Sequence, residues 1–79
     1  MRTVATTVNE IFAAWPELYG FSVRQIEGEL CLDDVATDPW HAHSETIAGE
    51  IAAALVELLD EQPDAAKLLN GRTFARTLH

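Results

Sequence analysis

The chain has a single cysteine, Cys31, and few basic residues. One thiol excludes a disulfide within the chain and any zinc or iron–sulfur cluster held by cysteine alone. Five lysine and arginine residues stand against thirteen acidic ones, which gives a formal net charge of −8. Nucleic-acid binding through phosphate contacts requires the opposite sign, and anionic membrane surfaces are disfavoured for the same reason.

Long apolar runs and clustered glycines are missing as well. No stretch approaches the roughly 20 apolar residues of a membrane span, and residues 1–7 lack the apolar core of a secretion signal. The four glycines are too scattered to form a phosphate-binding loop. We therefore expect a cytoplasmic protein that binds no membrane and no cofactor.

What the chain does contain is ordinary globular composition, with 48% hydrophobic and 23% charged residues. At 79 residues it is long enough for one small domain, residues 1–79, and too short for two. So short a chain buries a modest share of its surface, which makes oligomerisation a plausible route to a larger core.

The first predicted element is an amphipathic helix. Its apolar side chains recur on one helical face: Val4, Val8, Ile11, Phe12 and Trp15. Thr7 and Glu10 have the spacing of a capping box, which places the firm start near Val8 and leaves residues 2–8 free to be extended instead. Pro16 and Gly20 predict a turn over residues 16–20.

Residues 21–35 have the pattern of a β-hairpin. Pairing residues whose numbers sum to 55 sets Val23 opposite Leu32 and Gln25 opposite Leu30, with the turn at Glu27-Gly28. In this register the apolar side chains share one face of the hairpin: Phe21, Val23, Leu30 and Leu32. The other face carries Arg24, Glu29, Cys31 and Asp33, with Arg24 between two acids.

A long amphipathic helix is predicted next. Asp38-Pro39 is a helix-start pair, with Ser44 as a second candidate cap, and the helix ends near Glu61. One face of it is apolar: Trp40, Ile47, Ile51, Leu55 and Leu58. A short helix over 64–69 follows, closed by Asn70-Gly71, and residues 72–79 form a basic tail that can be mobile or add a further helical turn.

The predicted fold class is therefore α+β, with the order αββαα. A lone two-stranded antiparallel hairpin is marginally stable and leaves two open edges. Pairing two hairpins across a two-fold axis would give a four-stranded sheet, so we expect a homodimer.

The stretch from Cys31 to His43 has the densest group of potential metal ligands. His41, His43, Cys31 and Asp33 have the chemistry of zinc ligands. If the long helix begins at Pro39, however, residues two apart diverge by about 200° and the two imidazoles cannot converge on one ion. Histidines at a helix start that interact with nearby acids are the alternative.

Two groups of residues are candidates for binding a partner. The tail carries Arg72, Phe74 and Arg76 and no acid, while the long helix carries exposed acids at Glu50, Glu57 and Glu61. The structural alternative for the tail is that Phe74 docks on the core and the arginines meet the domain's own acids. The acids can equally be the solvated face of an amphipathic helix.

No pattern in the chain predicts a catalytic site. We therefore expect a small non-catalytic protein-interaction module, such as an accessory or regulatory subunit, whose net charge favours a basic protein partner. A transition-metal-binding protein and a small enzyme or enzyme subunit remain the alternatives.

Overall fold

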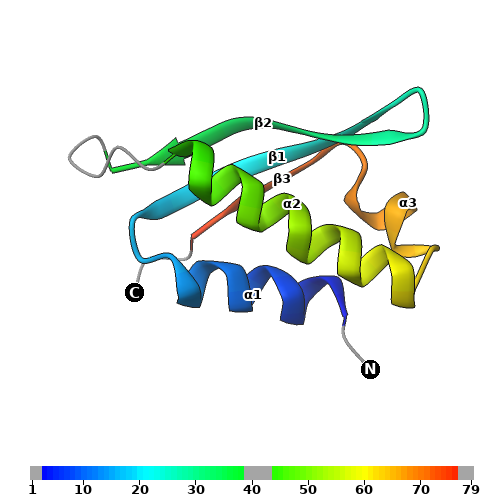
Figure 1. Cartoon of the computed structure of the whole chain (residues 1–79), viewed down its shortest axis with the longest axis horizontal. Coiled ribbons are helices and arrows are strands. Elements are labelled where there is room, and N and C mark those ends of the chain that lie inside the picture. The colour runs from blue at the N-terminus through cyan, green and yellow to red at the C-terminus, as the bar shows by residue number, and fades with distance from the viewer. Residues whose placement is uncertain (1–2, 39–43, 77–79) are drawn as a thin grey trace.

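The computed structural model describes residues 3–38 and 44–76. Its elements follow in chain order: α1 (Val4–Ala14), β1 (Leu18–Ile26), β2 (Glu29–Thr37), α2 (Ser44–Glu61), α3 (Ala65–Leu69) and β3 (Arg72–Ala75). The strands form one antiparallel sheet in the order β2-β1-β3, and α1 and α2 lie against one face of it (Figure 1). The predicted α+β class is confirmed.

Helix α1 begins one turn earlier than the sequence pattern suggests. Thr3, rather than Thr7, is the N-cap, because its side-chain oxygen accepts a hydrogen bond from the backbone N–H of Thr6 at 3.0 Å. Thr7 lies inside the helix and is 1% exposed, and among residues 3–38 and 44–76 its hydroxyl has no hydrogen-bond partner. A buried hydroxyl without a partner loses its hydration and gains nothing in return.

Replacing Thr7 with valine is therefore expected to stabilise the protein by about 1 kcal/mol, since valine keeps the branched shape and removes the unpaired hydroxyl. Urea denaturation measures the difference. Thr46→Val, at an exposed position of α2, is the control and should change stability by less than about 0.5 kcal/mol. A clear loss of stability in Thr7→Val would mean that the hydroxyl does have a partner.

The predicted hairpin register is confirmed where β1 and β2 approach their turn. The Cα partners run from Ser22↔Asp33 to Ile26↔Glu29, each pair summing to 55. Glu27 and Gly28 both have positive φ, 52° and 84°, as a two-residue turn between twisted strands requires. Towards its other end the ladder contains an irregularity beside Asp34, whose φ is 51°.

Strand β1 begins at Leu18, so the predicted turn over residues 16–20 is shorter than expected and Gly20 belongs to the sheet. Arg24 forms an ion pair with Asp33 on the face of the hairpin that turns away from the helices. Of the two acids expected beside Arg24, Asp33 is thereby found in contact with it.

The C-terminal segment corrects the predicted order of elements. Arg72–Ala75 is a strand, β3, which pairs antiparallel with β1 through Phe21↔Phe74, so the sheet has three strands rather than two. The chain reverses at Gly71, whose φ is 77° and whose N–H donates to the Val23 carbonyl at 2.8 Å. Residues 72–75 are therefore not a helical turn.

Helix α2 follows the predicted pattern over Ser44–Glu61, and its apolar face is buried. The proposed start at Pro39 and the side chain of Trp40 lie outside the described residues. In the described part of the chain, no helix combines the length and the apolar character that crossing a lipid bilayer requires.

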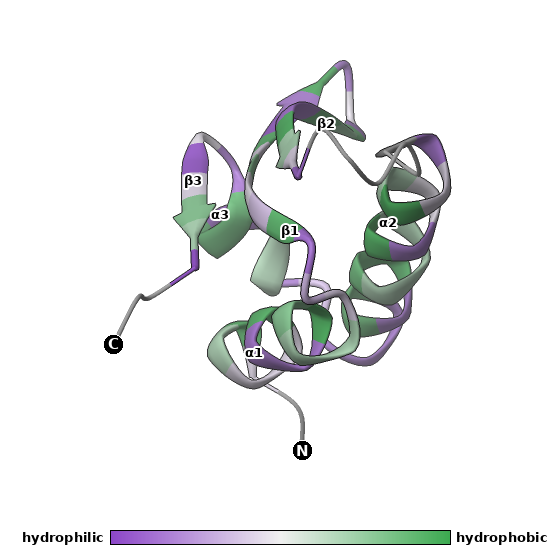
Figure 2. Cartoon of the chain, turned by 90° about the vertical axis from the view of Figure 1, so that its left-hand side faces the viewer, coloured by the Kyte–Doolittle hydropathy of each residue, from purple (hydrophilic) through white to green (hydrophobic). Residues whose placement is uncertain are grey.

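One hydrophobic core joins the helices to the sheet. Phe21 is its centre, fully buried between the rings of Phe12 and Phe74 at centroid distances of 5.7 and 5.3 Å. The buried apolar residues are Val8, Ile11, Phe12, Leu18, Phe21, Val23, Ile47, Ile51, Leu55, Leu58, Ala65, Leu69 and Phe74. In Figure 2 the hydrophobic stretches of α1 and α2 turn towards β1. Phe74 thus ties β3 into the same core as the helices.

Candidate functional site

The predicted metal ligands fall partly outside the described residues. Cys31 and Asp33 lie in β2, on the sheet face away from the helices, and Asp33 is already paired with Arg24. His41 and His43 belong to the segment 39–43, which the structure does not describe. Among residues 3–38 and 44–76, no cluster of three or more His, Cys, Asp or Glu side chains could hold a metal ion. The metal site remains a prediction that the structure does not test.

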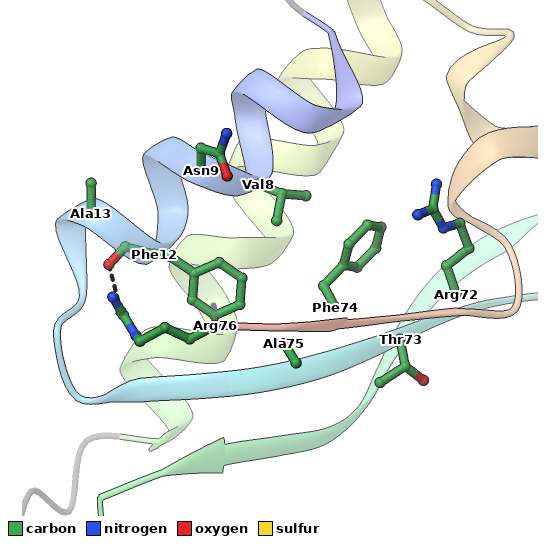
Figure 3. A pocket seen from close by; sticks show the side chains of 9 residues that line it. All are labelled: Val8, Asn9, Phe12, Ala13, Arg72, Thr73, Phe74, Ala75 and Arg76. Atoms are coloured by element: carbon green, nitrogen blue, oxygen red, sulfur yellow. Dashed lines mark hydrogen bonds between the residues drawn. The ribbon is translucent and has the colours of Figure 1, made fainter. Parts of the chain in front are cut away.

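A groove runs between α1 and β3, and we refer to it as the α1–β3 groove. It consists of two adjoining hollows of about 490 and 450 Å³ that share Val8, Asn9, Arg72 and Phe74. Figure 3 shows Val8 and Phe74 turned towards each other across it, while Thr73 and Ala75 point to the other side of the sheet. Its remaining lining residues are Thr3, Val4, Ala5, Phe12, Ala13, Leu68, Thr73, Ala75 and Arg76.

The floor of the α1–β3 groove is apolar, whereas its walls also carry polar and charged side chains, among them Asn9 and Arg72. Val8, Phe12 and Phe74 belong to the hydrophobic core and present only an edge to the groove. Leu68 of α3 stands at the rim and is 58% exposed, although it is a large apolar side chain. A large apolar side chain exposed at the rim is the kind of surface that a binding partner would cover.

The outer edge of β3 carries backbone groups that pair with no strand in the described part of the chain. The N–H of Arg76 donates to the Tyr19 carbonyl at 2.9 Å, which fixes the phase of the ladder. Because an antiparallel ladder alternates, Arg72 and Phe74 direct their backbone groups to β1, whereas Thr73 and Ala75 direct theirs to the open edge. The groove therefore borders a free strand edge.

The side chain of Arg76 is hydrogen-bonded to the backbone of the fold. Its Nη2 donates to the carbonyls of Phe12 and Trp15 at 2.6 and 2.7 Å, and its Nε donates to that of Leu18 at 2.8 Å. Phe12 and Trp15 lie at the C-terminal end of α1, where carbonyls lack partners within the helix, and Leu18 begins β1. The Trp15 carbonyl also accepts the N–H of Leu18 at 3.0 Å, so the guanidinium adds a second donor there. The guanidinium therefore meets backbone carbonyls rather than the acidic side chains that the sequence suggested as partners, and Figure 3 shows its bond to Phe12.

Arg72 is exposed and lies in the α1–β3 groove. Its guanidinium carbon sits 5.1 Å from the centroid of the Phe74 ring. No ion pair links it to a carboxylate within the described residues, whereas Arg24 has Asp33. Of the three predicted tail residues, Phe74 is therefore in the core, Arg76 holds the backbone, and Arg72 offers an accessible cation.

The predicted acidic residues lie elsewhere, on α2. Glu50, Glu57 and Glu61 are all exposed. Glu50 and Glu57 line a smaller hollow of about 190 Å³ on the other flank of α1, together with Glu10, whereas Glu61 does not reach it. Glu10 and Glu57 are engaged in interactions of their own, which makes this acidic hollow the weaker candidate for a binding site.

Arg72 and Phe74 were predicted from the sequence as partner-binding residues, but the groove to which they belong was not predicted. Asn9 and Leu68 come from α1 and α3, and only the pairing of β3 with β1 brings these elements beside the C-terminal segment. Leu68 carried no usable signal, because helical spacing places it close to the side of α3 that Ala65 and Leu69 form, and only the structure shows it to be exposed.

Comparisons of the chain with protein-family models, with curated proteins and with solved structures give no match.

Proposed function

We propose that the chain is a small non-catalytic protein-interaction module that binds its partner through the α1–β3 groove. The observation that carries the proposal is the coincidence of three features along β3: an apolar hollow, the exposed Leu68 at its rim, and the open strand edge. Proteins usually cover or interrupt such an edge, because it pairs readily with another chain. A partner that fills the groove would cover all three features at once.

The experiment compares two charge insertions at equally exposed apolar positions. Leu68 lies at the groove and is 58% exposed, while Val56 lies on α2 and is 54% exposed. Leu68→Glu should abolish capture of the partner that the tagged wild-type chain retrieves from its native cell. Val56→Glu should leave this capture unchanged, and neither variant should lose more than about 0.5 kcal/mol of stability.

Equal capture by the wild type and by Leu68→Glu would exclude the α1–β3 groove as the binding site. Loss of capture in Val56→Glu alone would move the site to α2. Because both side chains are exposed in the free protein, a difference between the variants reports on binding rather than folding.

The expected homodimer stays a proposal, and β3 changes which edges could form it. A two-stranded hairpin alone has two open edges, and the expected dimer paired two such hairpins. β3 covers the β1 edge, so a second copy can add only to the outer edge of β2 or of β3. Light scattering over a range of concentrations separates the cases, since a constant monomer mass would exclude the dimer.

A further inference from the structure

We propose that the occupant of the α1–β3 groove is an extended segment of another protein, which adds a strand to β3 and carries a carboxylate that pairs with Arg72. This inference rests on the proposed function and specifies the chemical character of the partner. The acidic occupant differs from the basic partner that the net charge of −8 favours. We favour the acidic occupant because the groove itself is positively charged.

The charged side chains that line the α1–β3 groove are positive, whereas the chain as a whole is negative. Thirteen acidic residues give the protein its net charge, yet none of them lines either hollow, whereas Arg72 and Arg76 both do. Arg76 is already bonded to three carbonyls, which leaves Arg72 as the cation that a ligand can reach. A guanidinium pairs with a carboxylate through two parallel hydrogen bonds, and the ring of Phe74 beneath it holds it in place.

The open edge specifies an extended occupant. Thr73 and Ala75 present backbone donors and acceptors to the edge, and a strand laid beside β3 would pair with them. Side chains of a strand alternate between faces, so every second residue of the added strand would enter the groove. The residue beside Phe74 would meet apolar surface, and the residue beside Arg72 would meet the guanidinium. Arg72 and Phe74 are two positions apart, so the occupant requires an apolar and an acidic residue with the same spacing.

The test begins with a display library of random heptapeptides selected on the full-length chain. The enriched peptides should carry an aspartate or glutamate two positions from an apolar residue. A synthetic copy of the most enriched peptide should bind the wild type at least about ten times more tightly than the same peptide with lysine in place of the acid. Arg72→Glu should reverse this preference, since the exposed side chain can change sign without disturbing the core.

Three results of the selection would reject an acidic strand as the occupant. The enriched peptides could lack an acid, or acid-bearing peptides could bind Arg72→Glu as well as they bind the wild type. The third such result is that no peptide is enriched. A concentration-dependent mass that Leu68→Glu restores to the monomer would also reject it, because the occupant would then be a second copy of the chain. The proposed function fails separately, when Leu68→Glu retains the cellular partner. Loss of that partner in Leu68→Glu together with any of the overturning results would leave the groove as the site and reject only its acidic occupant.

Discussion

Replacing Arg76 with methionine is expected to lower the free energy of unfolding by about 3 kcal/mol. The methionine keeps much of the apolar stem but removes the donors that reach the carbonyls of Phe12, Trp15 and Leu18 at 2.6–2.8 Å, and the Trp15 carbonyl keeps the N–H of Leu18 at 3.0 Å. It also removes a positive charge from the C-terminal end of α1, whose own last turn has no basic residue. The guanidinium further stacks over the Phe12 ring at 5.2 Å.

Arg72→Met is the matched control for this prediction. Arg72 lies in β3, four residues before Arg76, and stacks on a phenylalanine at nearly the same distance, 5.1 Å, but it is exposed and bonds to no backbone carbonyl in the described residues. Its replacement should cost less than about 1 kcal/mol. Equal losses in the two variants by urea denaturation would show that stacking on the ring, and not the carbonyl bonds, accounts for the effect of Arg76.

Substituting valine for Gly20 is expected to destabilise the protein by about 2–3 kcal/mol. A Cβ at this position would lie 2.9 Å from the carbonyl oxygen of Phe74, which is closer than real contacts allow. The obstacle is backbone of β3 rather than a flexible side chain, so the two strands must separate. Since the side chain of Phe74 in β3 is part of the hydrophobic core, separating the strands would also weaken the packing of the core.

Gly49→Ala is the control for the loss of a glycine, because a Cβ at Gly49 meets no atom within 4 Å. Alanine in the interior of α2 should stabilise the protein by about 0.5–1 kcal/mol. The two substitutions are therefore expected to have opposite signs in the same denaturation experiment. A neutral Gly20→Val would contradict the close approach of β1 and β3.

The sequence predicted most of what local periodicity determines. The hairpin register followed from the alternation of Val23 and Leu32 with polar neighbours, because a shift by one residue would have moved apolar side chains to the other face. The apolar face of α2 followed from helical spacing in the same way. Local caps were less decisive, since Thr3 and Thr7 both suit a helix start. They are separated by the hydrogen bond that Thr3 accepts from Thr6 and by the burial of Thr7, both of which depend on the fold.

The third strand could not be predicted from local pattern. β3 is four residues long, and its alternation of Arg72, Phe74 and Arg76 on one face reads as a polar tail until β1 is placed beside it. The α1–β3 groove depends on this long-range pairing, which joins residues far apart in the chain. The arginines at and beside the ends of β3 concealed the strand, because the partners of Arg76 are backbone carbonyls, and a sequence pattern gives no sign of such partners.

The central claim is that the outer edge of β3 is where a partner binds, and amide hydrogen exchange at residues 73–76 tests it most directly. In the free protein, the amides of Phe74 and Arg76 should exchange slowly and those of Thr73 and Ala75 quickly, because only the first two donate to β1. On binding the partner, Thr73 and Ala75 should become protected. Continued rapid exchange at both, with new protection on β2 instead, would contradict the claim.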